Sequence, residues 1–153
     1  MTEQLLESLG LYGGTLVVCF VSGLVPLINT ELFLVGLGVV AVTSPAQIVP
    51  IAVLAAIGQT SAHLVLYLAG LGVVGLPRGR TRDKIERARA RVAKWQKRPH
   101  FVLALAAVIG IPPLMLVSVV AGAMKISVRA YCLITLVGRT VRFAAILAIP
   151  WLA

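Results

Sequence analysis

The chain has 153 residues, of which 59% are apolar and only 12% are charged, whereas about a quarter of the residues of a soluble domain are charged. This composition excludes an ordinary soluble globular domain and indicates an integral membrane protein. The net charge of +9 does not indicate nucleic-acid binding, because ten of the fourteen basic residues fall between Arg78 and Arg98. Such a cluster is first of all a signal of membrane topology.

The apolar residues gather in four blocks. A helix needs about 20 residues to span the hydrocarbon core, so we expect about four membrane elements in a single membrane domain over residues 1–153. Both cysteines lie inside apolar blocks without metal-ligand spacing, so neither a metal nor another cofactor is expected. The blocks cover residues 11–42, 48–76, 101–124 and 130–152.

The N-terminal ten residues precede the first block. Glu3 and Glu7 stand where a signal peptide would carry basic residues, so the segment is expected to remain attached. Leu5, Leu6 and Leu9 share one face of a short predicted amphipathic helix. We expect this helix to lie at the membrane surface.

The first block is interrupted near its middle by Gly23, Pro26, Asn29 and Glu31. Two short half-helices joined by a break explain this pattern, and a long tilted helix with a proline kink is the alternative. Broken helices at membrane depth are tolerated only where the backbone groups are buried in protein or line a wet cavity. The break at Pro26 therefore predicts an internal polar pocket.

Glu31 is the first candidate for a transport site. A charge at the centre of a spanning segment costs at least about 2.5 kcal/mol, so an ionisable group there is read as functional. Asn29 lies two residues before it and is the second candidate.

The second block is predicted to be one unbroken helix ending near Leu76. Ser44, Pro45 and Gln47 supply an N-cap, a proline at the first helical position and a capping glutamine. Inside the helix Gln59, His63 and Tyr67 recur every fourth residue, so they share one face, which should look into the bundle. Gln59 and His63 are candidates for a polar path. The alternative is that they only make hydrogen bonds between helices.

Residues 77–100 form a basic connector between the two halves of the chain. Its apolar residues are spaced by three, four and three, which predicts an amphipathic helix. We expect it on the anionic cytoplasmic leaflet, although a topology anchor without a substrate role explains it as well. The apolar stripe is Ile85, Ala88, Val92 and Trp95, and the basic surface residues are Arg87, Arg91, Lys94 and Arg98.

The third block should also be broken, because the adjacent Pro112 and Pro113 remove two consecutive backbone donors. Ser127 is a predicted N-cap for a last helix that runs to about Trp151. This helix carries Arg139 and Arg142 on one face, where they can present two guanidinium groups to a phosphate. The alternative is a buried structural ion pair between one of them and Glu31.

The order of broken segment, short turn and unbroken helix thus occurs twice, which is the pattern of an inverted repeat. The predicted fold is an all-α integral membrane protein with repeats over residues 11–76 and 101–153, joined by the basic amphipathic helix of residues 77–100. Each repeat is expected to contain a re-entrant broken-helix hairpin and a transmembrane helix. If all four blocks spanned the membrane instead, the basic turn of residues 125–129 would not lie on the same side as the basic connector. The positive-inside bias would then be weaker.

Several of these motifs occur together in one known family. The chain resembles the DedA superfamily, also called the VTT or SNARE-associated domain, and most closely its short YqaA-like branch. It departs from the longer members of the family at three positions. Gln59 stands where those members carry an acidic residue or asparagine, and Ile109 and Met115 stand where they carry arginines. The motifs are Pro26 with Asn29-Thr30-Glu31, Gly58-Gln59, Pro112, the run from Ala121 to Ser127, and Gly138-Arg139 with Arg142-Phe143.

The resemblance implies translocation of a lipid or lipid-linked phosphate, such as undecaprenyl phosphate, across a bacterial inner membrane. We expect Glu31 to alternate between an arginine and a proton, so that the arginines become available to the headgroup. The partners would be anionic lipids or polyprenyl phosphates, and protons, without nucleic acid. The glycines also permit a homo-oligomer.

Two other classes of function remain open. A proton-coupled exporter of a small solute or cation would also use Glu31 and His63, and a structural membrane adaptor would use the basic connector. An enzyme is not expected, because the chain has no HExxH, GxSxG or paired-carboxylate motif.

Overall fold

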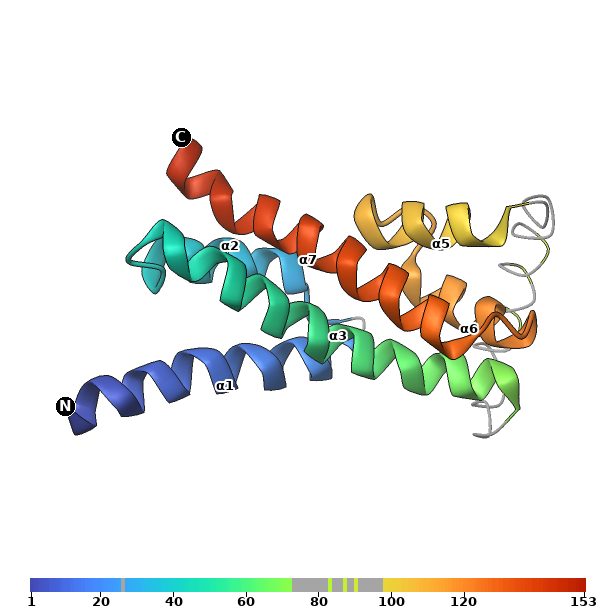
Figure 1. Ribbon diagram of the computed structural model, residues 1–153, viewed down its shortest axis with the longest axis horizontal. Helices are drawn as coiled ribbons and strands as arrows, with labels where there is room; N and C mark the ends of the chain where they lie inside the picture. The colour runs from blue at the N-terminus through green and yellow to red at the C-terminus, as the bar shows by residue number, and fades with distance from the viewer. Residues whose placement is uncertain (26, 73–82, 84–86, 88–89, 91–97) are drawn as a thin grey trace. The chain divides into compact units, whose positions relative to one another are not determined.

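The computed structural model describes residues 1–25, 27–72, 83, 87, 90 and 98–153 (Figure 1). All regular structure among these residues is helical, which confirms the all-α class. Three helical segments, 2–24, 45–71 and 128–152, are long and apolar enough to cross a membrane. The elements are α1 (Thr2–Leu24), α2 (Thr30–Val40), a 3-10 turn (Pro45–Gln47) leading into α3 (Ile48–Leu71), α5 (Pro99–Val108), α6 (Leu114–Ala123) and α7 (Val128–Leu152).

The predicted break in the first block is confirmed, because α1 ends at Leu24 and α2 begins at Thr30. Pro26 itself lies outside the described residues. The expectation of a separate surface helix followed by a short half-helix is wrong. α1 runs without interruption for 23 residues from Thr2, since no proline separates the N-terminal segment from the apolar block.

The predicted start of the long central helix is also confirmed. The Gln47 side-chain oxygen accepts hydrogen bonds from the backbone N–H groups of Thr43 at 2.9 Å and Ser44 at 3.3 Å. These bonds satisfy donors that have no partner within the helix. α3 ends at Leu71, and the predicted continuation to residue 76 lies outside the described residues.

The second break lies between α5 and α6, where the double proline predicted it. Gly110 adopts a φ of +87°, and the Ile111–Pro112 peptide bond is cis. Pro113 is the N-cap residue of α6. The predicted cap of the last helix is present too, because the Ala130 N–H donates to the Ser127 hydroxyl at 3.3 Å.

The described residues form two compact units, one of Met1–Ala62 with Arg139–Ala153 and one of His63–Gly138. Both α3 and α7 contribute to each unit. The core of the second unit gathers side chains from α3, α5, α6 and α7, including Tyr67, Leu103, Leu114, Val117 and Tyr131.

In the first unit α1 lies along the first half of α3 (Figure 1). The backbones touch at Gly58, where an added Cβ would lie 2.5 Å from the Leu16 carbonyl oxygen. α2 approaches the end of α7 in a similar way, since a Cβ at Gly38 would lie 3.3 Å from the Leu147 carbonyl oxygen. Small residues thus allow close helix packing where lipid supplies no hydrophobic driving force.

Little of the basic connector is described. Asp83, Arg87 and Arg98 are exposed, as a surface position would require. Arg91 and Lys94, together with the predicted apolar stripe, lie outside the described residues.

Substituting Gly58→Ala should lower the free energy of unfolding by about 1–3 kcal/mol, because the new methyl group overpacks the contact of α3 with α1. Gly36→Ala is the matched control, since nothing lies within 4 Å of a Cβ at that helical glycine; it should leave stability unchanged or raise it by up to about 1 kcal/mol. Thermal unfolding in detergent measures both. Equal stability of the two variants would contradict the close approach.

Candidate functional site

An ion pair joins the start of α2 to the middle of α7. The Arg142 Nε donates to Glu31 Oε1 at 3.0 Å, and the Arg142 Nη2 donates to the same oxygen. The Arg142 side chain is 19% exposed and that of Glu31 is 47% exposed. Of the two arginines proposed from the sequence, Arg142 is therefore the partner of the carboxylate.

Asn29 fixes where α2 begins and so where Glu31 lies. Its side-chain oxygen accepts hydrogen bonds from the backbone N–H groups of Glu31 at 3.0 Å and Leu32 at 3.3 Å. Glu31 consequently lies in the first helical turn, where the positive end of the helix dipole favours a carboxylate. Asn29 thus has a structural role as an N-cap residue.

Beside the ion pair, a chain of hydrogen bonds connects three helices. The Gln59 Nε2 of α3 donates to the Thr30 hydroxyl at 2.9 Å, and that hydroxyl lies 2.6 Å from the Ser22 hydroxyl of α1. Ser22 donates its single proton to the Cys19 carbonyl at 2.9 Å. Thr30 must therefore donate to Ser22, and the chain runs in one direction from Gln59 to Cys19.

This chain of hydrogen bonds does not satisfy every buried polar atom of the first unit. The Gln59 Oε1 and the Thr60 hydroxyl are buried without a hydrogen-bond partner among the described residues. A buried polar atom without a partner costs about 1–3 kcal/mol, so proteins seldom keep one without a reason. Both atoms lie in the first unit, as does the ion pair.

Arg139 lies one turn before Arg142 on α7 and is only 8% exposed. Its guanidinium carbon lies 5.7 Å from the centroid of the Phe143 ring. A cation over an aromatic face is stabilised electrostatically. Two arginines are thus held within one turn of the same apolar helix.

The predicted polar face of α3 is confirmed as buried. Gln59, His63 and Tyr67 are 6%, 4% and 1% exposed. His63 belongs to the second unit, whereas the ion pair belongs to the first. Tyr67 has a structural role there, because its hydroxyl donates to the Ile126 carbonyl and its ring stacks on Tyr131 at a centroid distance of 4.6 Å.

The remaining predicted residues that the structure describes belong to the second unit. Pro112 and Pro113 mark the break of the second unit, and Arg87 and Arg98 are exposed. No group of three or more potential metal-ligating side chains occurs in the part of the chain that the structure describes.

Sequence reasoning assigned no role to Ser22 and Thr30, which connect Gln59 to α1 and α2. Thr30 was named only as part of a motif, and its position directly before the lone carboxylate is the signal that could have identified it. Phe143, which lies under Arg139, was noted only as part of a motif.

The family model of the VTT domain matches residues 25–150 of the chain. The matched range contains Glu31, Gln59, Arg139 and Arg142. Comparison with curated proteins and with solved structures found no match.

Substituting Glu31→Gln should lower the free energy of unfolding by about 1–3 kcal/mol, because it leaves the largely covered Arg142 without its countercharge. Adding Arg142→Gln should cost about 1 kcal/mol less than the sum of the single changes. Denaturant unfolding measures the cycle, with Glu3→Gln on the exposed first turn of α1 as the control. Strict additivity would show that the two side chains do not interact.

Proposed function

The chain belongs to the VTT-domain family of DedA membrane proteins, and from this premise we propose that it moves a phosphate-bearing lipid across the membrane. A polyprenyl phosphate such as undecaprenyl phosphate, or a phospholipid, is the substrate class. The protein transports this lipid without chemical conversion. The observation that carries the proposal is the pairing of Glu31 with Arg142, beside a second covered arginine, in the apolar helix α7.

A lipid phosphate needs a countercharge within the membrane, because an isolated charge is very costly in hydrocarbon. A guanidinium group suits this task, since its planar fork matches two phosphate oxygens. Arg142 already binds one oxyanion, the Glu31 carboxylate, so a phosphate would compete for the same donors. The N-terminus of α2 adds a dipole that favours anions at this place.

Protonation of Glu31 provides the switch in this proposal. A protonated Glu31 carries no charge and holds Arg142 only weakly, so the guanidinium group becomes available to the phosphate. When the phosphate leaves, Glu31 releases the proton and pairs with Arg142 again. The buried Gln59 Oε1 offers an additional hydrogen-bond acceptor for a protonated group in the proposed transport site.

The proposed topology rests on the two breaks and on the short helices beside them. α2, α5 and α6 have 11, 10 and 10 residues, or about 15 Å each at 1.5 Å per residue, which is half of the hydrocarbon core. We infer two re-entrant hairpins in an inverted repeat, α1 with α2 and α5 with α6, besides the spanning α3 and α7. The length of α1, 23 residues, would by itself also allow it to span, so the first hairpin rests on the break after Leu24 and on the shortness of α2. The basic connector and the turn with Lys125 and Arg129 then share the cytoplasmic side of a bacterial inner membrane.

Transport by the purified protein in liposomes tests this proposal. Arg142→Ala and Arg139→Ala should each slow translocation of a labelled polyprenyl phosphate by roughly tenfold or more, since each removes charge-assisted hydrogen bonds to the phosphate. Glu31→Gln should remove the dependence of the rate on pH. The matched control is Arg129→Ala, an exposed arginine in the first turn of the same helix.

Parental rates in Arg142→Ala and Glu31→Gln would contradict the lipid-transport proposal. Transport of a small cation, altered by the same variants in liposomes that show no lipid movement, would favour the exporter instead.

A further inference from the structure

The first turn of α2 is attached to the rest of the first unit by two sets of contacts. Glu31 pairs with Arg142 of α7. Thr30 contacts α1 and α3, because its hydroxyl lies 2.6 Å from the Ser22 hydroxyl and accepts a hydrogen bond from the Gln59 Nε2 at 2.9 Å. Thr30 and Glu31 are consecutive residues of one helix, so contacts that hold Thr30 also fix the backbone from which the Glu31 side chain extends.

The two sets of contacts differ in burial. Ser22, Thr30 and Gln59 are 6%, 7% and 6% exposed, whereas the Glu31 side chain is 47% exposed. Attraction at an exposed carboxylate is screened, and hydrogen bonds inside a protein of low dielectric constant are stronger. The contacts of Thr30 are therefore the firmer attachment of this turn, and the ion pair is the one whose partner can change.

The Thr30 hydroxyl serves as an acceptor from Gln59 and as a donor to Ser22. Valine has nearly the same shape and can do neither. The Gln59 amide has little room to reach another group, because its stem packs against α1; an added Cβ at Gly23 would lie 3.2 Å from the Gln59 Cγ. The attachment of α2 to α3 at this turn thus depends on one hydroxyl group.

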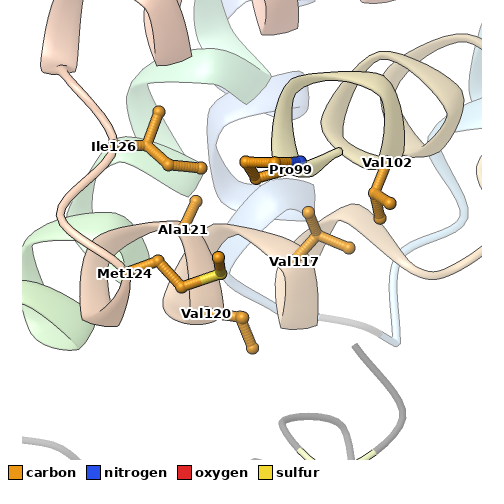
Figure 2. Close-up of a pocket in the computed structure, with 7 residues that line it drawn as sticks. All are labelled: Pro99, Val102, Val117, Val120, Ala121, Met124 and Ile126. Carbon is orange, nitrogen blue, oxygen red and sulfur yellow. The ribbon is translucent and has the colours of Figure 1, made fainter. Parts of the chain in front are cut away.

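Hydrogen bonds are not required merely to pack two helices of this protein together. In the second unit α5 and α6 pack through apolar side chains such as Leu103 and Val117. Figure 2 shows a small pocket beside them, and every residue that lines it is apolar, including Pro99 and Val102. The polar contacts of Thr30 therefore indicate a purpose beyond packing.

We propose that Thr30 and Gln59 are positioning residues for the ion pair of Glu31 and Arg142. They hold the first turn of α2 against α1 and α3, so that the carboxylate is already placed where it meets the guanidinium group. A contact between preorganised groups is stronger, because less conformational freedom is lost when it forms. The strength of the ion pair then depends on two uncharged side chains outside it.

The consequence for transport rests on the proposed function. The positioning decides how strongly Glu31 competes with a phosphate for Arg142. When the turn is no longer held, the carboxylate competes less well, so the half-saturating concentration of the lipid phosphate should fall. The maximal rate should fall as well, because Glu31 then displaces the bound phosphate more slowly.

A double-mutant cycle of Glu31→Gln and Arg142→Gln, measured by denaturant unfolding in detergent, tests the positioning without any transport. In the parent the two changes should be coupled by a factor of roughly five in the unfolding equilibrium. With Thr30→Val present, this factor should fall below about two, because the turn that carries Glu31 is no longer held. Thr30→Ser keeps the hydroxyl group and should restore the coupling of the parent.

A second background separates positioning from loss of stability. Thr30→Val alone leaves the Gln59 amide unsatisfied and destabilises the fold. Combining it with Gln59→Met replaces both partners by apolar side chains of similar shape, which costs less, yet the coupling should still be lost. Thr60→Val is the matched control, because it removes a buried hydroxyl of α3 that has no hydrogen-bond partner among the described residues. It should keep the coupling of the parent.

Parental coupling in the combined Thr30→Val and Gln59→Met background would overturn the inference, because the hydroxyl chain would then only join helices. An equal loss of coupling in Thr60→Val would overturn it too, since any change in α3 would then have the same effect. Liposome assays judge the proposed function separately. If the parent moves no lipid phosphate while the coupling depends on Thr30, the transport proposal fails and the positioning stands.

Discussion

A carboxylate within an apolar segment must have a countercharge, and the first compact unit is arranged around that requirement. Glu31 receives two hydrogen bonds from Arg142, which lies 111 residues away in the sequence. The pair depends on the break between Leu24 and Thr30, since only a helix that starts there puts Glu31 in its first turn. Asn29 caps that start, and Thr30 ties it to α1 and α3 through Ser22 and Gln59. The break, the cap, the hydroxyl chain and the ion pair therefore form one arrangement.

The proposed transport function uses this pair of opposite charges. A partly buried pair is weak evidence for stability, because screening at the exposed carboxylate and desolvation of the covered guanidinium group offset much of their attraction. Its partners can therefore be exchanged at modest cost, provided that another ion of the right charge replaces the one that leaves. In the proposed transport, a phosphate replaces the Glu31 carboxylate at Arg142 once that carboxylate is protonated. Arg139, one turn away and held over Phe143, supplies a second cation in the same helix.

Much of the fold was predictable because its signals are local. Ser44 and Gln47 cap the 3-10 turn that leads into α3, Pro113 is the N-cap residue of α6 and Ser127 caps α7, each through chemistry visible in a few residues. The full length of α1 was missed because the polar N-terminal residues with Leu5, Leu6 and Leu9 were interpreted as a separate amphipathic helix, whereas one continuous helix includes them. The choice of Arg142 over Arg139 depends on how α2 packs against α7, which periodicity does not encode. No role could be assigned to the hydroxyls of Ser22 and Thr30 from the sequence, since isolated small polar residues in an apolar run carry no periodic signal.

The central claim is that the lipid phosphate and the ionised Glu31 exclude each other at Arg142. Infrared difference spectroscopy of the reconstituted protein, recorded upon addition of the lipid phosphate, reports the state of the carboxyl group directly. The account predicts that a carboxylate band is lost and a carboxylic-acid band appears in the parent, and that both changes are absent in Glu31→Gln. Lipid binding with Glu31 still ionised would contradict the account.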